Sequence, residues 1–142
     1  MKNAKRLLAA GLTVGLLTLA TALPAFAAGT AVQVGRVSLV ARGAGVDVTV
    51  AVTCDPYTDY WGSSMTSTPV QVTLTEALRR GNLTTGSGTG VAVCDSTPHG
   101  VTVLVVASGY AFARGPALVW VTPTFDSAST PPVVSGATVR IH

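Results

Sequence analysis

Apolar and polar residues alternate along most of the chain beyond residue 28. In residues 46–54, valines at the even positions are separated by Asp, Thr and Ala at the odd positions, and the run ends at Cys54. Because successive side chains of a strand point to opposite faces of a sheet, this period of two predicts a β-strand with one buried face. The same period recurs in residues 70–75, 101–105, 117–121 and 137–141.

Two further segments, "AVQVGRVSLV" and "LTTGSGTGVAV", are rich in β-branched residues and complete a set of seven predicted strands. No segment after residue 28 shows a helical period of 3.6, and "LTEALRRGN" ends in the turn residues Gly81 and Asn82. Seven short strands separated by Gly, Pro, Asn and Ser predict an all-β, immunoglobulin-like antiparallel β-sandwich, with a small β-barrel as the alternative. The predicted strands lie near residues 31–40, 45–54, 69–78, 83–94, 100–107, 116–122 and 136–142.

The fourth predicted strand does not fit a simple alternation. Cys94 stands at an even position and Val91 and Val93 at odd ones, so in a regular strand the cysteine and the two valines would point to opposite faces. A bulge in this strand or a twist at its last residue is expected to bring them to the same face. The glycine-rich stretch 86–90 likewise indicates a bulged or edge strand. In "ASGYAFARG", which connects the fifth and sixth predicted strands, Tyr110 or Phe112 is expected to plug the core.

The first 27 residues are typical of a secretory signal peptide. Lys2, Lys5 and Arg6 precede an apolar run from Leu7 to Leu23, and Pro24 leads into small residues at Ala25 and Ala27. A membrane anchor is the alternative, but the run is shorter than the roughly 20 residues of a spanning helix. The sequence therefore predicts a signal peptide at 1–27 and a single secreted domain at 28–142, without a membrane partner after cleavage.

The leader also accounts for the basic charge of the chain. Of nine basic residues, three lie in the leader, and the six remaining arginines balance six acidic residues. A nucleic-acid partner needs a basic surface, so none is expected. Charged residues make up only 11% of the chain, well under the usual quarter, and Ser and Thr must supply much of the polar surface.

Two cysteines, Cys54 and Cys94, are expected to form a disulfide in an oxidising compartment. A closed loop of about 40 residues would stabilise the fold by about 4 kcal/mol in the chain-entropy model. Neither cysteine has His or acidic partners at metal-ligand spacing, so no metal and no cofactor is expected.

The segment from "VDVTVAVTCDP" to "GYAFARGPALV" resembles a group of small secreted actinobacterial proteins. The residues that carry the resemblance are Cys54 at a strand end, the Cys94-x-x-x-Pro98 turn and Phe112-x-x-Gly115 before a Val-rich strand. The resemblance implies a signal peptide and one β-sandwich domain, and brings no established activity. Many members carry a second cysteine pair near the C-terminus, and "TPTFDSASTPPVVSG" has none, which implies a looser final loop.

If the strands run alternately up and down, every even-numbered strand finishes at the same end of the sandwich. Cys54 and Cys94 close the second and fourth predicted strands, so both are expected there. The loops 55–68, 95–99 and 123–135 should share that end, which we call the loop end. Long, varied loops on a rigid scaffold are where binding surfaces usually lie.

Tyr57, Tyr60 and Trp61 are the main candidates for a binding role, with Phe125 and His99 expected nearby. Aromatic side chains offer large, rigid contact areas that suit a protein or a glycan partner. The competing interpretation is that two or more of them fold inward and cap the core, and the inward orientation is favoured.

The loop end also holds Asp55, Asp59, Asp95 and Asp126, without the spacing of a known calcium loop. Asp55 and Asp95 follow cysteines and precede turns, so we expect them to cap backbone amides. A Ser96–His99–Asp95 triad is conceivable, but no nucleophile elbow or oxyanion motif accompanies it, and no catalytic residue is expected.

The function predicted from the sequence is therefore that of a secreted, non-enzymatic β-sandwich that binds an unidentified protein or glycan through its loop end. The alternative is a structural protein of the envelope or matrix without a specific ligand. An enzyme is the least favoured of the three classes.

Overall fold

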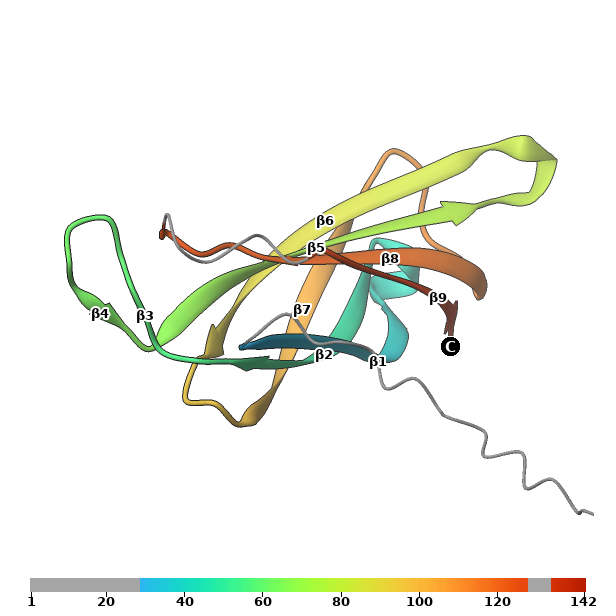
Figure 1. The fold of residues 1–142 in the computed structure, drawn as a ribbon. Coiled ribbons are helices and arrows are strands. Elements are labelled where there is room, and N and C mark those ends of the chain that lie inside the picture. The colour runs from blue at the N-terminus through green and yellow to red at the C-terminus, as the bar shows by residue number, and fades with distance from the viewer. Residues whose placement is uncertain (1–28, 128–133) are drawn as a thin grey trace, which may run out of the picture.

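A computed structural model describes residues 29–127 and 134–142, which form an all-β structure (Figure 1). The predicted signal peptide and residues 128–133 of the last loop lie outside the described residues. Within the described part, no helix is long and apolar enough to cross a bilayer. The elements are β1 (Thr30–Val40), η1 (Ala41–Gly43), β2 (Gly45–Cys54), β3 (Tyr57–Thr58), β4 (Ser64–Met65), β5 (Ser67–Ala77), η2 (Arg79–Gly81), β6 (Leu83–Val93), β7 (Pro98–Ser108), β8 (Gly115–Pro123) and β9 (Ser135–Ile141).

The seven long strands form one antiparallel sheet in the order β1-β2-β7-β6-β5-β8-β9. Dividing this order between β6 and β5 leaves one set of four strands and one of three, joined by the β5–β6 hairpin. These sets have the strand order of the two sheets of a constant-type immunoglobulin domain. The predicted fold class is confirmed, and each predicted strand boundary lies within a few residues of the observed one.

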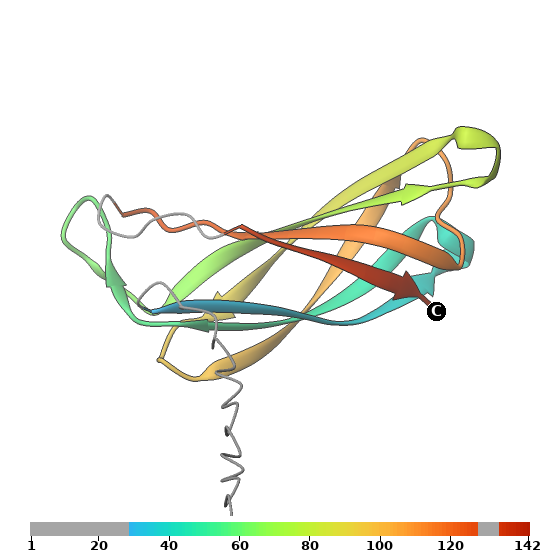
Figure 2. The same cartoon turned by 45° about the vertical axis from the view of Figure 1, so that its right-hand side comes forward.

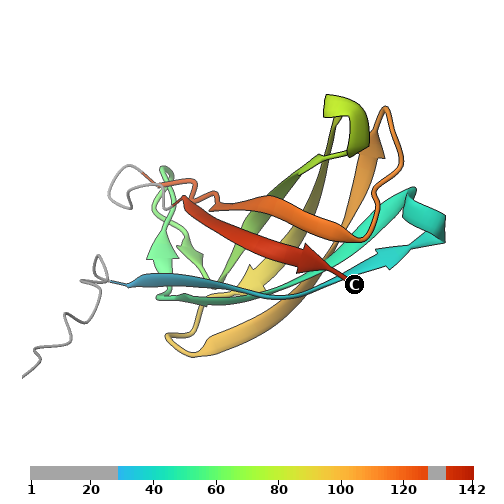
Figure 3. The ribbon, with the colours of Figure 1, turned by 90° about the vertical axis from the view of Figure 1, so that its right-hand side faces the viewer.

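The sheet also curls until its first and last strands meet, which makes the molecule nearly barrel-shaped (Figures 2 and 3). The backbone N–H of Leu39 donates to the carbonyl of His142 at 3.0 Å, and the N–H of His142 donates to the carbonyl of Val37 at 3.2 Å. With an odd number of antiparallel strands, β1 and β9 run in the same direction. The sandwich and barrel alternatives therefore describe two aspects of one curled sheet.

Branched aliphatic side chains on the inner faces of the strands form the core, as their alternation predicts. Phe112 plugs the core at the crossover between β7 and β8, whereas Tyr110 is 58% exposed. The crossover is held by the N–H of Phe112, which donates to the carbonyl of Gly43 at 2.8 Å. The hydrophobic core residues of β2, β5 and β8 are Val46, Val48, Val50, Val52, Cys54, Val70, Val72, Leu74, Ala117, Val119 and Val121.

The bulge or terminal twist predicted for the fourth strand is wrong, because Val91 and Val93 do not face inward with Cys94. Both face solvent, with exposed fractions of 64% and 46%, while Ala92 and Cys94 are fully buried. β6 pairs with β5 from Leu83 to Val93 without a register shift, and β6 lies inside the sheet order rather than at an edge. The bulge lies instead in β1, between Val34 and Val37.

Glycine occupies inward positions of β6 because β7 passes too close for a side chain. A Cβ atom on Gly88 would lie 2.1 Å from the carbonyl oxygen of Leu104, and one on Gly86 would lie 2.4 Å from that of Val106. The glycine-rich stretch therefore marks a close backbone approach.

Candidate functional site at the loop end

The described parts of the three loops are joined around the disulfide that the sequence predicts. Cys54 and Cys94 are bonded, with a Cα–Cα distance of 4.6 Å, and both are fully buried. The N–H of Ser96 donates to the carbonyl of Cys54 at 2.9 Å, and that of Cys94 to the carbonyl of Thr66 at 2.8 Å. The third loop is attached through the N–H of Thr124, which donates to the carbonyl of Pro69 at 2.9 Å.

A small hairpin, β3–β4, projects from this end beyond the main sheet (Figure 1). The N–H of Asp59 donates to the carbonyl of Ser63 at 3.0 Å, and the N–H of Gly62 donates to that of Asp59 at 3.2 Å. Gly62 has φ +85°, a left-handed conformation that glycine adopts without steric cost. A hydrogen-bonded turn followed by a left-handed glycine is a common three-residue hairpin loop.

The carboxylate of Asp59 holds this turn from inside. Its Oδ1 accepts the N–H of Trp61 at 2.9 Å and the N–H of Ser63 at 2.7 Å. Aspartate at the first position and glycine at the fourth are favoured in type I turns. The sequence "DYWG" therefore carried a turn signal that points to Asp59 rather than to Asp55 as the cap.

Tyr60 and Trp61 occupy the two central positions of the turn and face solvent, with exposed fractions of 63% and 80%. We call this pair the aromatic tip. The inward orientation expected for the aromatic residues is wrong for both of them. The hairpin extends past the end of the sheet, so no core surface lies within reach of its apex.

Tyr57 and Phe125 instead pack against each other at the base of the hairpin. Their rings make an edge-to-face contact, with centroids 5.2 Å apart and planes at 89°. The Tyr57 hydroxyl donates to the carbonyl of Ser67 at 3.2 Å. Half-buried Tyr57 is thus an anchor that ties the hairpin to the β8–β9 loop, and the aromatic tip is displayed on a fixed support.

His99, the fifth candidate, is the second residue of β7 and belongs to a separate cluster with Asp95 and Thr97 of the preceding turn. Its Nε2 atom lies 2.8 Å from Oδ1 of Asp95 and 3.1 Å from the hydroxyl oxygen of Thr97. Among the described residues, neither a hydrogen bond nor a ring contact connects His99 to the aromatic residues of the hairpin. The expected association of His99 with the aromatic residues is therefore not found.

Asp95 caps its turn as the sequence predicts. Its Oδ1 accepts the Thr97 hydroxyl at 2.6 Å and the Thr97 N–H at 3.0 Å, in addition to its contact with His99. These hydrogen bonds, from the Thr97 hydroxyl first and then from His99, lower the pKa of Asp95 from 3.8 to about 2. The Asp55 carboxylate caps no turn among the described residues, and lies instead against Gly29.

The His99 cluster does not have the geometry of a catalytic triad. In a triad, one ring nitrogen binds the carboxylate and the other faces the nucleophile. Here Nε2 makes both the Asp95 and the Thr97 contacts, and Ser96 is not hydrogen-bonded to the ring. Within residues 29–127 and 134–142, no group of three or more His, Cys, Asp or Glu side chains could hold a metal ion.

The loop end has acidic side chains but no lysine or arginine to balance them. Loops 55–68, 95–99 and 123–135 contain four aspartates and neither lysine nor arginine. Asp55, Asp95 and Asp126 are exposed, and the only ion pair at this end joins Asp95 to His99 among the described residues. The aromatic tip is therefore presented within an acidic surrounding.

No family model, curated protein or solved structure compared with this chain matches it. The resemblance to small secreted actinobacterial proteins thus stays a prediction.

Proposed function

We propose that this chain is a secreted, non-enzymatic binding module that contacts its ligand through the aromatic tip. The observation that carries the proposal is the exposure of Tyr60 and Trp61, 63% and 80%, on a turn fixed by Asp59. Tyrosine and tryptophan have few rotatable bonds, so a rigidly held pair loses little entropy when a ligand covers it. Burial of these rings supplies the favourable free energy of binding.

Secretion is supported by the leader-like N-terminus and by the Cys54–Cys94 disulfide. Structural disulfides persist mainly in oxidising compartments outside the cytosol. The absence of a second cysteine pair leaves this bond as the one covalent cross-link that the sequence allows.

The proposed ligand is a neutral or basic surface, either on a protein or on an uncharged glycan. Four aspartates without lysine or arginine at the loop end would repel anionic polymers. The non-enzymatic part of the proposal rests on the His99 cluster, in which one nitrogen serves both neighbours.

The experiment compares the binding profiles of three proteins on glycan and protein arrays. They are the wild type, a tip variant Tyr60→Ser/Trp61→Ser, and a control Tyr110→Ser/Trp120→Ser. The control removes the same residue types from exposed positions elsewhere, where Tyr110 is 58% and Trp120 44% exposed. We expect the tip variant to lose the signals that the wild type and the control share.

Equal profiles for the tip variant and the wild type would contradict the proposal. A wild-type protein that gives no specific signal on either array would favour the structural alternative, an envelope or matrix protein without a specific ligand.

A further inference from the structure

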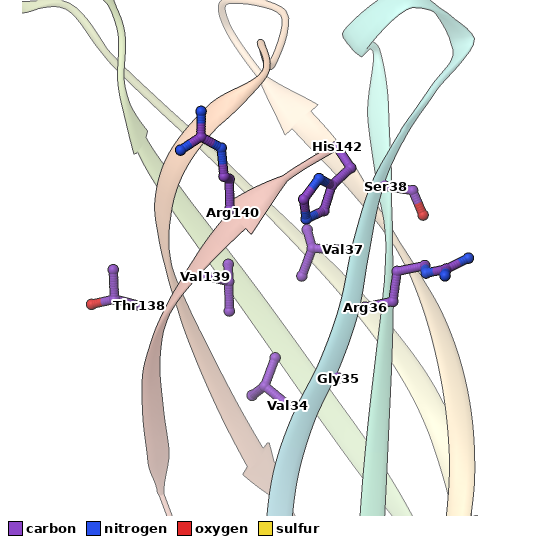
Figure 4. A pocket seen from close by; sticks show the side chains of 9 residues that line it. All are labelled: Val34, Gly35, Arg36, Val37, Ser38, Thr138, Val139, Arg140 and His142. Atoms are coloured by element: carbon purple, nitrogen blue, oxygen red, sulfur yellow. The ribbon is translucent and has the colours of Figure 1, made fainter.

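An open groove of about 720 Å³ separates β1 from β9 (Figure 4). We call it the seam. Residues 34–38 of β1 line one side, and residues 138–140 with His142 line the other. The seam is distinct from the aromatic tip, because none of the loop-end candidates lines it.

The two strands are hydrogen-bonded to each other only where the seam closes. Leu39 and Val37 exchange backbone hydrogen bonds with His142, and no other backbone hydrogen bond joins β1 to β9 among the described residues. From this point the strands diverge toward the loop end (Figures 1 and 3). Along the opening, each strand is paired on one side only, which leaves two free sheet edges facing one groove.

The floor of the seam is apolar. The side chains of Val34, Val37 and Val139 point into the gap between the strands (Figure 4). Val37 is 1% exposed and belongs to the core, and the other two are partly buried against that core. A side chain that enters the seam therefore meets the hydrophobic interior directly.

Positive charge flanks both sides of the seam. Arg36 and Arg140 are exposed, and neither forms an ion pair with a described residue. Among the residues that the structure describes, neither aspartate nor glutamate lines the groove. The positive charge along the two sides of the seam, which we call its rim, is thus complementary to carboxylates on a molecule that occupies the seam.

The strand count determines the direction of an added strand. β1 and β9 run in the same direction because they are the first and last of seven antiparallel strands. A strand laid between them in the opposite direction would be antiparallel to both. An eighth strand would therefore complete an antiparallel ring, and it would pair both free edges at once.

We propose that the seam binds an extended acidic segment of a partner protein by β-strand addition. A segment of about five or six residues spans about 17–20 Å, the usual length of a strand. Alternate residues with small apolar side chains would contact Val34 and Val139, and carboxylates on the other face would approach Arg36 and Arg140. Main-chain hydrogen bonds supply affinity in this mode, and the side-chain pattern supplies specificity.

The probe is a fluorescein-labelled peptide of sequence Glu-Val-Thr-Val-Asp-Val-Thr-Glu, titrated with the whole protein and followed by anisotropy. We expect saturable binding, and slower hydrogen exchange of the backbone amides at 30–36 and 135–140. A peptide with Pro in place of the central Val should lose binding, because proline lacks the N–H that pairs with an edge.

Charge-reversal variants test the rim. Arg36→Glu/Arg140→Glu should weaken binding of the acidic peptide at least about tenfold and should bind a Lys-substituted peptide more tightly than the wild type does. The matched control, Arg79→Glu/Arg114→Glu, reverses two exposed arginines that do not line the seam. Its affinity for the acidic peptide should stay within about twofold.

A filling variant tests the groove independently of charge. Val34→Phe places a larger side chain in the seam, and it should block the peptide while the thermal unfolding transition remains cooperative. The aromatic-tip variant should bind the peptide as the wild type does, so that failure of either proposal can be recognised separately.

Three results would overturn the inference: no saturable binding by the wild type, equal losses in the two double-arginine variants, or binding that survives Val34→Phe in a folded protein. A fourth such result can come from sedimentation of the protein in the absence of peptide. A dimer that Val34→Phe dissociates would identify a second copy of this chain, rather than an acidic partner segment, as the occupant.

Discussion

Asp59 accepts two backbone hydrogen bonds within its own turn, from Trp61 and Ser63. A carboxylate that accepts hydrogen bonds from backbone N–H groups in this way stabilises a turn as a capping side chain stabilises a helix end. The consequence extends beyond the turn, because the same two bonds hold Tyr60 and Trp61 at the apex with their rings in water.

Replacement of Asp59 by Ala should loosen the turn without unfolding the domain. The loss is expected to be about 0.5–2 kcal/mol, as for other capping side chains, and to be confined to the hairpin. Hydrogen exchange at the Trp61 and Ser63 amides should become faster, while the midpoint of thermal unfolding changes little. Asp126→Ala, an exposed aspartate of the neighbouring loop, is the control. Unchanged exchange at both amides in Asp59→Ala would show that the carboxylate does not hold the turn.

Asp95 is the residue whose ionisation is most clearly coupled to the fold. Hydrogen bonds from the Thr97 hydroxyl, His99 and the Thr97 N–H favour its charged form and lower its pKa from 3.8 to about 2. A carboxylate with a lowered folded pKa contributes stability that is fully present above the unfolded value. That contribution is lost as the pH falls from about 4 towards 2.

We therefore expect the carboxyl carbon of Asp95 to titrate in the NMR spectrum with a midpoint near 2. In Thr97→Val, which removes the hydroxyl donor, the midpoint should move upward towards 3.8, the ordinary value. A wild-type midpoint close to that ordinary value would contradict the assigned hydrogen bonds.

At the scale of elements, β6 shows why alternation alone can give the wrong face. Val91 and Val93 are the most hydrophobic residues in the second half of this strand, yet they point to solvent. The inner face is occupied by small residues because β7 crosses closely behind it. Burial here is set by the distance between two consecutive strands, β6 and β7, and the periodicity within one strand contains no information about that distance.

Gly88→Ala should destabilise the domain by about 1–3 kcal/mol or more, in the range of overpacked cores. Its new methyl group would lie 2.1 Å from the carbonyl oxygen of Leu104, so the backbone has to move. Gly100→Ala is the control, because nothing lies within 4 Å of a Cβ atom there. Urea unfolding measures both, and equal stabilities of the two variants would contradict the close approach of β6 to β7.

The seven strands, the Cys54–Cys94 pairing and the shared loop end could be predicted from the sequence. Five strands follow from alternation and two from their β-branched residues, the pairing follows from the presence of two cysteines, and the shared end follows from strand parity. The β3–β4 hairpin could not be predicted from periodicity, since each of its strands has two residues. Its turn was readable in "DYWG", which places Asp and Gly at favoured turn positions. The direction of Tyr60 and Trp61 depends on how far the hairpin extends past the sheet, which no local pattern encodes.

At the scale of the whole molecule, charge is separated between the two ends. β2, β6 and β8 finish at the loop end, where Asp55, Asp95 and Asp126 follow them. β1, β5, β7 and β9 finish at the opposite end, where Arg42, Arg79 and Arg114 lie in the connections and Arg140 lies near the end of β9. The net charge from residue 28 onwards is zero, yet these aspartates and arginines lie at opposite ends of the molecule.

The Cys54–Cys94 disulfide is expected to contribute a large part of the stability of this small domain. Cys54→Ala/Cys94→Ala opens a loop with a sequence separation of 40 residues and should lower the free energy of unfolding by about 4 kcal/mol. Guanidinium unfolding of the oxidised wild type and the double variant measures the difference. A loss below about 1 kcal/mol would show that the curled sheet is stable without this bond.

The most direct test of the central claim, that ligands are bound at the aromatic tip, uses the two tryptophans of the chain as separate reporters. Trp120→Phe leaves Trp61 as the sole tryptophan, and Trp61→Phe leaves Trp120. The free protein should show stronger acrylamide quenching for Trp61, which is 80% exposed, than for Trp120, which is 44% exposed.

The deciding measurement adds the tightest-binding ligand from the arrays to both single-tryptophan proteins. We predict that Trp61 emission shifts to shorter wavelength and is protected from acrylamide, with a saturation curve that matches the binding isotherm, while Trp120 emission stays unchanged. Binding that leaves Trp61 fully quenchable, or that alters only Trp120, would contradict the account.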